Sequence, residues 1–454
     1  MSAKTINPYT EEQLFEVDYI SLEEVNKKIN TAHSAYNSWK NKTFEERWEL
    51  LKNLVKIMWE KKEELAKLNV IEMWMLYNDA LWDVSKSMSN IMYFVENTKK
   101  LLQEKTFEEW WIKWKVTYSP TWVLYSVAPW NYPFNQVFRS TIPQIIAWNT
   151  VVVKHASNLP QVSMMIEKLF LEAWFPQGIY TNLLIPWSYS KDIIENKHVV
   201  WTMITWWDKA WRVIWELAWK NLKPSVLELG WNDAFIVSKT NDLDSIVSNA
   251  ISARLSNCWQ KCNSSKRFIV LEEIYDEFVE KFAQKMEDLI IWDPMDSKTK
   301  IWPLAKKEAV EEIDIMVKNS IKAGAKIKTW WEKINIKWYF YKPTVIYDVK
   351  PWMDVFDKEI FGPVWAIIKA KDIDEAINLA NNSVFGLWCS IFWDNKKDLE
   401  YIASKVEVSN VWINKIVTSY PFLPYWWIKN TWYGKELWER WIKTFCNEKV
   451  VVIG

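Results

Sequence analysis

The chain has 454 residues, with 57 Lys or Arg against 57 Asp or Glu, so its formal net charge is zero. Because no excess of positive charge is available to attract polyanions, we expect neither nucleic acid nor an anionic membrane as a partner. Four cysteines and three histidines are too few for a disulfide framework and leave little material for a metal site, so we expect no metal and a reducing compartment.

The N-terminal part of the chain, residues 10–105, has the pattern of amphipathic helices, with Leu, Val and Ile at helical spacing among charged residues. The opening residues contain no basic segment followed by an apolar core, and no apolar run reaches the roughly 18 residues that a membrane helix needs. These observations favour a cytoplasmic protein.

From about residue 112 the pattern changes to short β-branched runs such as "WVLYSVAPW" and "NTVVVKHAS", separated by helical segments. This alternation predicts a parallel, doubly wound α/β sheet of the kind that binds nucleotides. A second alternating block covers about 232–415 and predicts a second α/β domain. The final "KVVVIG" predicts a short apolar strand, and such a strand tends to pair with a partner.

The glycine and tryptophan contents are abnormal. An average protein has about 7% Gly, or about 32 in a chain of this length, whereas this chain has 7 Gly and 36 Trp. Tryptophan doublets such as Trp206-Trp207 lie in expected turns, where Gly is favoured. We therefore hypothesise that most of these tryptophans are glycine in the natural protein, as when UGA is read as glycine. The alternative is a genuinely Trp-rich protein.

Three segments contain candidate chemical groups. If Trp is read as Gly, "TMITWWDKAW" becomes a strand, a glycine turn and a helix, which would bind a pyrophosphate. Strand "TVVVK" ends at Lys154, which would meet a nucleotide or simply be solvated. Cys258 and Cys262 have a spacing that suits neither a redox pair nor a metal site. Each cysteine, like Cys389 and Cys446, could equally be a small buried hydrophobic residue.

Several further motifs occur in a specific order: "PWNYP" at 129–133, "VVVK" at 151–154, "ITWWDKAW" at 204–211, "LELGW" at 227–231, "NCWQKC" at 257–262, "KEIFGPV" at 358–364 and "PYWWIKNTWYG" at 424–434. With them, nearly the whole chain resembles the NAD(P)-dependent aldehyde dehydrogenases. Glycine stands in that family at the positions of Trp122, Trp148, Trp174, Trp206, Trp211, Trp231, Trp259, Trp302, Trp388, Trp426, Trp427 and Trp432. Trp130, by contrast, matches a family Trp.

The resemblance implies an aldehyde dehydrogenase-like α/β fold with three parts. A Rossmann-type cofactor domain would comprise residues 1–111 and 128–228, and an α/β catalytic domain would comprise 229–415. Residues 112–127 and 434–454 would form bridging strands used in oligomerisation. A homodimer or homotetramer is therefore expected.

The resemblance also implies a catalytic set. Cys262 would be the nucleophile, because a thiolate attacks an aldehyde carbon readily. Asn131 would donate to the developing alkoxide, although "PWNYP" could also be only a turn. Glu228 would activate the water that hydrolyses the thioester, and its presence argues against a coenzyme-A-acylating enzyme.

The expected cofactor is NAD or NADP. The residues that the resemblance places at the cofactor are Trp130, Lys154, Ser157, Trp206, Trp207, Glu359 and Phe361. Many NAD-preferring members have Glu at the position of Ser157, where it would repel a 2′-phosphate. Its absence favours NADP or dual use, although Ser157 could be only a helix cap.

The expected substrate is a small aldehyde. The chain resembles bacterial succinate-semialdehyde dehydrogenases, which implies that Arg139 pairs with the substrate carboxylate and that Ser419 contacts the substrate. An Arg that some of these enzymes use six residues before the nucleophile is Ser256 here. The alternatives are a structural ion pair for Arg139 in an enzyme for uncharged aldehydes, and a non-catalytic relative with a structural or binding role.

Overall fold

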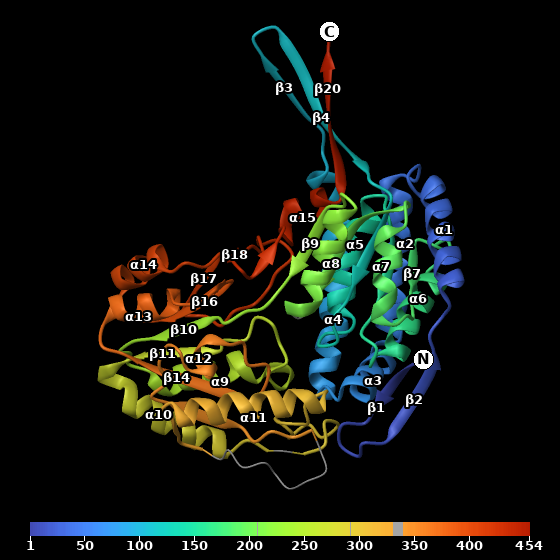
Figure 1. The fold of residues 1–454 in the computed structure, drawn as a ribbon. Coiled ribbons are helices and arrows are strands. Elements are labelled where there is room, and N and C mark those ends of the chain that lie inside the picture. Colours follow the sequence, from blue (N-terminus) through green and yellow to red (C-terminus); the bar gives the residue numbers. More distant parts are fainter. Residues whose placement is uncertain (207, 291, 330–338) are drawn as a thin grey trace.

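The structure is a computed structural model, and it describes residues 1–206, 208–290, 292–329 and 339–454 (Figure 1). The N-terminal part pairs two strands and then forms four helices that pack beside the first large sheet. These elements are β1 (Ser2–Ile6), β2 (Gln13–Asp18), α1 (Leu22–Trp39), α2 (Phe44–Glu60), α3 (Lys62–Met73) and α4 (Tyr77–Leu101). The amphipathic helices predicted for 10–105 are largely present.

The first large sheet has six strands in the order β19-β9-β8-β5-β6-β7. All neighbours are parallel except the β19–β9 pair. The strands are β5 (Val123–Val127), β6 (Thr150–Lys154), β7 (Tyr180–Asn182), β8 (Val199–Thr205), β9 (Ser225–Glu228) and β19 (Trp432–Tyr433). The helices are α5 (Asn135–Ile146), α6 (Pro160–Glu172), α7 (Ser190–Glu195) and α8 (Asp208–Lys220), and Trp187–Tyr189 form a 3₁₀ turn. Strand β6 is buried along its whole length, as its run of valines requires.

The second large sheet has seven strands in the order β12-β13-β14-β11-β10-β16-β17, and only β12 is antiparallel to its neighbour. The strands are β10 (Ala234–Val237), β11 (Arg267–Leu271), β12 (Lys326–Ile327), β13 (Thr344–Tyr347), β14 (Val364–Ala370), β16 (Trp388–Phe392) and β17 (Asn410–Ile413). The helices are α9 (Leu243–Leu255), α10 (Glu272–Glu287), α11 (Lys307–Lys322), α12 (Asp354–Asp357), α13 (Ile373–Asn381) and α14 (Lys396–Lys405), with a 3₁₀ turn at Ser256–Trp259.

A three-stranded antiparallel arm projects from the body (Figure 1). Its strands are β3 (Lys105–Glu109), β4 (Ile112–Pro120) and β20 (Cys446–Ile453), and α15 (Trp438–Thr444) lies at its base. A small ladder joins β15 (Phe385–Gly386) to β18 (Ile428–Lys429). Eight residues of β20 pair with β4, so the pairing expected for the C-terminal strand is found within the chain.

The strand pairing differs from the expected domain boundaries at two strands. Strand β5 lies in the predicted bridging segment 112–127, yet it pairs with β6 and β8 in the six-stranded sheet. Its five residues are all buried, so a central strand suits it better than an exposed arm. Strand β3 lies within the predicted cofactor segment 1–111 but pairs with β4 in the arm. Length and periodicity do not reveal which sheet a strand joins.

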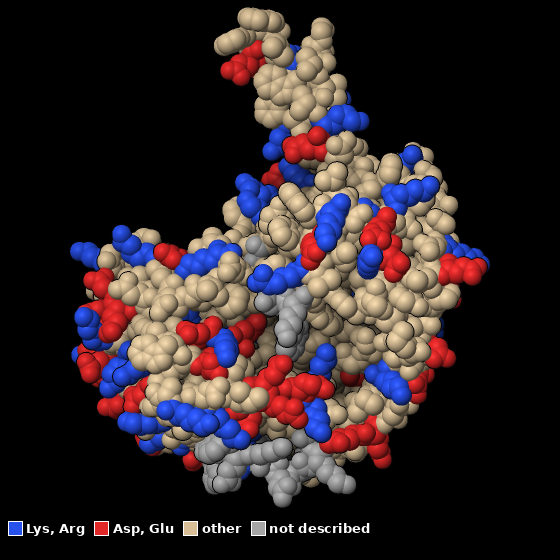
Figure 2. Space-filling view, in the orientation of Figure 1, with Lys and Arg blue, Asp and Glu red and all other residues tan. Residues whose placement is uncertain are grey.

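Acidic and basic side chains are interspersed over the face shown in Figure 2, without a large area of one sign. Across the described ranges, the helices are too short or too polar to cross a membrane. The described side chains also include no group of three or more His, Cys, Asp or Glu suited to a metal ion.

Tryptophan occupies left-handed backbone with unusual frequency. Of 14 described non-glycine residues with positive φ, seven are Trp: Trp74, Trp110, Trp122, Trp148, Trp174, Trp352 and Trp438. Bulky residues rarely adopt this conformation.

The ends of α6 and α11 allow a direct comparison. After α6, the N–H of Trp174 (φ 71°) donates to Leu171 and the N–H of Phe175 donates to Phe170. After α11, Gly324 (φ 107°) begins the same double hydrogen-bond pattern. This pattern is the Schellman motif, in which the left-handed residue is usually Gly. Trp174 therefore stands in a position for which the fold favours glycine.

Candidate active site

A cavity of about 1180 Å³ is lined by residues that belong to both large sheets and their helices. Thr205, at the end of β8, lies on one side, and α11 contributes residues between Ala309 and Met316. Of the residues predicted for the site, six line this cavity: Trp130, Asn131, Trp206, Cys262, Glu359 and Phe361. Segments far apart in the sequence therefore meet at one place.

Cys262 lies between the 3₁₀ turn at 256–259 and strand β11, and it is 6% exposed. Burial raises the pKa of its thiol to about 12, and the nearby Glu228 carboxylate raises it further. The positive charges of Arg139, Lys261 and Lys266 oppose this shift. The thiol is consequently protonated at neutral pH in the chain alone, and its activation requires additional stabilisation of the thiolate.

Asn131 is buried on the loop that follows β5. Its Nδ2 donates to the Gln260 carbonyl oxygen at 2.9 Å, and its own carbonyl accepts from Asn257 Nδ2 at 2.6 Å. These bonds fix the amide beside the segment that carries Cys262. The amide group has two N–H donors, and among the described residues the second has no hydrogen-bond acceptor.

Glu228 is the last residue of β9 and is completely buried. Thr205 Oγ1, on the neighbouring strand β8, donates to its Oε2 at 2.9 Å, whereas Oε1 accepts no hydrogen bond from any described residue. Burial raises the pKa of Glu228 to about 8, with a further rise from Glu436 and an opposing effect of Arg139. A carboxyl with this pKa can accept a proton near neutral pH.

Arg139 lies on α5 and does not line the cavity. Its guanidinium forms an ion pair with Glu436 and lies 4.3 Å from the ring centroid of Tyr425. Both members of the ion pair are buried. The contacts of Arg139 are therefore those of the alternative interpretation, in which Arg139 forms a structural ion pair. This pair lies in the interior of the protein and not on its surface. Ser419 is partly buried on the loop after β17 and is also absent from the cavity lining.

Lys154 ends strand β6 and is 2% exposed. Its Nζ donates to the His155 carbonyl oxygen at 3.1 Å and lies 5.8 Å from the ring centroid of Trp187. Burial lowers the pKa of Lys154 to about 8, and the positive charge of Lys306 lowers it further. Trp187 in turn stacks on Trp206, with 6.2 Å between the ring centroids. Trp206 lines the cavity, whereas Lys154 and Trp187 do not.

The remaining predicted cofactor residues occupy different places. The rings of Trp130 and Phe361 meet edge to face, with centroids 5.8 Å apart. Glu359 Oε1 pairs with Lys266 Nζ at 2.9 Å. Ser157 is exposed beyond the end of β6, and Trp207 lies outside the described residues.

Two polar residues of the site were not selected from the sequence. Thr205 holds the Glu228 carboxyl, and Glu436 neutralises Arg139. Thr205 follows four β-branched or apolar residues at a predicted strand end, which is a usable signal for a site residue. Glu436 lies beside charged residues in the segment "YGKELWER", and nothing in that pattern distinguishes a buried Glu from a solvated one.

Comparison with known proteins agrees with this arrangement. The aldehyde dehydrogenase family matches residues 1–451. The chain is 34% identical to a succinate-semialdehyde dehydrogenase [NADP(+)] of Deinococcus radiodurans, covering 98% of the chain and 94% of that protein. It is 33% identical to the crystal structure of succinic semialdehyde dehydrogenase from Streptococcus pyogenes in complex with NADP+, with a TM-score of 0.96 over 99% of both chains.

These matches confirm the predicted fold class, an aldehyde dehydrogenase-like α/β fold. They also agree with the predicted enzymatic activity, because the family match spans both sheets and the cavity between them. The chain belongs to the aldehyde dehydrogenase family and is an enzyme that oxidises aldehydes.

Proposed function

We propose that the enzyme oxidises succinate semialdehyde to the dicarboxylic acid with NADP, and that it also accepts NAD. The observation that carries this proposal is the meeting of Cys262 and Asn131 in one cavity, with Glu228 buried behind it. The substrate and cofactor are supported by full-length relatives from Deinococcus radiodurans and Mycobacterium ulcerans, each 34% identical and each named succinate-semialdehyde dehydrogenase [NADP(+)].

In the first step, the Cys262 thiol loses its proton to solvent, its Sγ forms a bond to the aldehyde carbon, and the carbonyl oxygen becomes an alkoxide. The remaining amide N–H of Asn131 and the backbone N–H of Cys262 are the proposed donors to that oxygen. Loss of one such donor typically slows acyl-transfer chemistry about 100- to 1,000-fold. The buried position of Asn131 keeps competing water away from these donors.

In the second step, Glu228 accepts a proton from water, the hydroxyl attacks the thioester, and the Cys262 thiolate leaves. The hydrogen bond from Thr205 holds one carboxylate oxygen, so the other, Oε1, is the one available to the water. Because the pKa of Glu228 is about 8, the carboxylate form becomes the major form only above that pH.

The charge of these residues fits a negatively charged dinucleotide. Lys154 is buried, and it takes part in no ion pair among the described residues. When bound, the nicotinamide would accept the hydride that leaves the carbon of the Cys262–aldehyde adduct, and the adduct would thereby become the thioester. Lys154 and Ser157 would hold its ribose end, and Trp130, Glu359 and Phe361 its nicotinamide end. The stacked indoles of Trp187 and Trp206 occupy space beside Lys154, which glycine at both positions would vacate.

Replacement of Arg139 tests the substrate assignment. If Arg139 binds the substrate carboxylate, Arg139→Ala removes a charge-assisted pair worth about 1.5–3 kcal/mol, or roughly a 10- to 150-fold loss of kcat/KM for succinate semialdehyde. An uncharged aldehyde of similar length should be affected little. Because Arg139 already pairs with Glu436, equal losses for both aldehydes would establish a structural role and remove the support that Arg139 gives to the acidic substrate.

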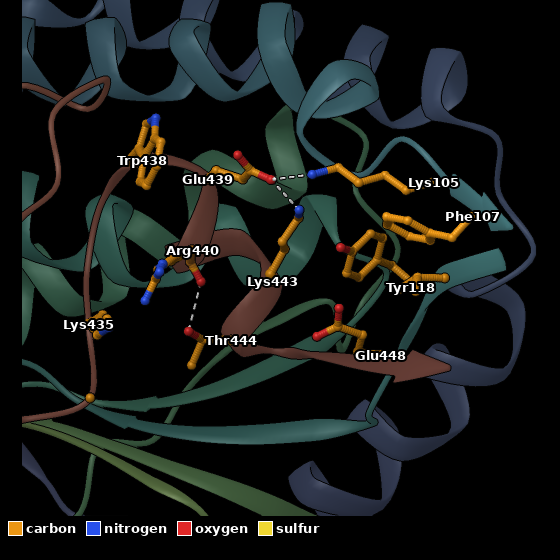
Figure 3. Close-up of a pocket in the computed structure, with 12 residues that line it drawn as sticks. Lys105, Phe107, Tyr118, Lys435, Trp438, Glu439, Arg440, Lys443, Thr444 and Glu448 are labelled. Atoms are coloured by element: carbon orange, nitrogen blue, oxygen red, sulfur yellow. Dashed lines mark hydrogen bonds and ion pairs between the residues drawn. The ribbon is translucent and has the colours of Figure 1, made fainter. Parts of the chain in front are cut away.

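We further propose that the arm joins two copies of the chain in the cytoplasm, as part of a homodimer or homotetramer. Strand β20 is at the edge of the arm sheet, and Val450 and Val452 are 60% and 66% exposed. A second hollow of about 830 Å³ lies at the base of the arm, where Glu439 pairs with Lys105 and Lys443 (Figure 3). Sedimentation of a Val452→Lys variant tests this interface, and an unchanged oligomeric state would contradict it.

A further inference from the structure

Lys306 is a charged residue at the cofactor side of the site that no predicted role includes. It immediately precedes α11, the helix that forms one wall of the active-site cavity. Its Nζ lies 6.0 Å from the ring centroid of Trp130 and 5.8 Å from that of Trp206. The first belongs to the loop that carries Asn131, and the second to the turn between β8 and α8. Lys306 therefore faces two separate loops of the site.

The ammonium group of Lys306 is partly buried. The two carboxylates that influence it most, Glu308 and Glu312, attract it only at a distance. The ion pairs formed by the described residues do not include Lys306. Burial lowers the pKa of Lys306, and the charges of Glu308 and Glu312 oppose this shift. A partly buried cation that forms no ion pair is costly unless a ligand neutralises its charge.

A second cation, Lys154, belongs to the same aromatic cluster, and the positive charge of Lys306 contributes to the lowering of its pKa. The two ammonium groups lie on opposite members of one aromatic stack: Lys154 at Trp187 and Lys306 at Trp206. A positively charged ammonium group therefore lies against each ring of the stack. With glycine at position 206, an anionic group that entered this space would interact favourably with both lysines.

We propose that Lys306 binds the diphosphate of the dinucleotide cofactor. The inference rests on the proposed function, since it assumes that this cavity receives NAD(P). The diphosphate is favoured over the 2′-phosphate because Lys306 lies against the Trp206 turn that leads into α8, and a helix N-terminus at such a turn is where a doubly wound sheet binds a pyrophosphate. A lysine at this place contributes to affinity for both cofactors, because NAD and NADP carry the same diphosphate.

The test measures the Kd values of NAD and NADP by titration calorimetry, without substrate, for the wild-type enzyme, made with glycine at the tryptophan positions where the family has glycine, and for Lys306→Ala in the same background. Loss of a charge-assisted contact should weaken the binding of both cofactors about 10- to 100-fold. Lys306→Arg should retain most of the affinity. Lys307→Ala is the matched control, because Lys307 is adjacent, equally charged and exposed, and its Kd values should not change.

The outcomes separate this inference from the proposed function. Binding by the wild-type enzyme with unchanged Kd values for Lys306→Ala would overturn the role of Lys306 alone. A loss confined to NADP would also overturn it, because the contact would then be to the 2′-phosphate. Failure of the wild-type enzyme to bind either cofactor would instead refute the proposed function. The dependence of log Kd on log salt should also become less steep in Lys306→Ala, since one phosphate contact is removed.

Discussion

The left-handed position after α6 provides a direct test of whether the fold requires glycine there. Trp174 has φ 71° and is 79% exposed, so most of its indole is in solvent. We predict that the Trp174→Gly variant is more stable than Trp174→Ala by about 1 kcal/mol. The two variants remove the same ring, and only Ala retains the Cβ that makes left-handed backbone cost about 1–2 kcal/mol. The greater chain entropy of unfolded Gly offsets part of this gain.

The matched control is Trp82, which is 44% exposed but lies in the interior of helix α4. In a helix, Ala is more stable than Gly by about 1 kcal/mol, so the order of the two variants should reverse. Gly324 gives the reciprocal change, because a Cβ at Gly324 would meet no atom within 4 Å. Gly324→Ala should therefore cost about 1 kcal/mol through its backbone conformation alone.

Urea unfolding gives the required free energies, in a background whose other left-handed tryptophans are glycine. If Ala is the more stable residue at position 174, the conformational argument is refuted. If it holds, seven such positions cost about 7 kcal/mol together, a large part of a typical stability of about 5–15 kcal/mol. Peptide mass spectrometry of the protein from its natural source should then find glycine at these seven positions.

Four further predictions concern catalysis and expression. Cys262→Ala should abolish aldehyde oxidation while the Kd of the cofactor stays nearly unchanged, and substantial residual turnover would contradict the nucleophile assignment. The Glu228→Gln variant should release an initial burst of reduced cofactor followed by slow turnover, and loss of the burst would place Glu228 in an earlier step. Since the deprotonated carboxylate is the active base and its pKa is about 8, kcat of the wild-type enzyme should rise with pH up to about 8, whereas Glu228→Gln should lack this rise. The chain made with tryptophan at 206, 207, 231, 259, 426 and 427 should be insoluble or inactive, because indoles at these turns would overpack the site; soluble, active protein would refute the glycine hypothesis.

The sequence predicted the order of helices and strands well, because burial and periodicity are local signals. Strand β6 shows this: its valines predict a buried strand, and Lys154 is found at its carboxyl end. The motif positions also brought Asn131 and Cys262 to one cavity. The assignment of β5 to a sheet could not be predicted in the same way, since a five-residue apolar strand fits a central or a bridging position equally well.

The polar contacts behind the cavity were less predictable for a physical reason. Arg139 and Glu436 are nearly 300 residues apart, and their pairing depends on how α5 packs against the segment before α15. A buried carboxylate is stable only if a cation or donor meets it, so Glu436 constrains Arg139 as strongly as a substrate carboxylate would. The same pair acts on Glu228 with opposite signs, because Glu436 raises its pKa and Arg139 lowers it. A substrate carboxylate that reached Arg139 would therefore compete with Glu436 and change the pKa of Glu228, the proposed base. Substrate selection and thioester hydrolysis would then be linked through one buried ion pair, and no single sequence motif contains that link.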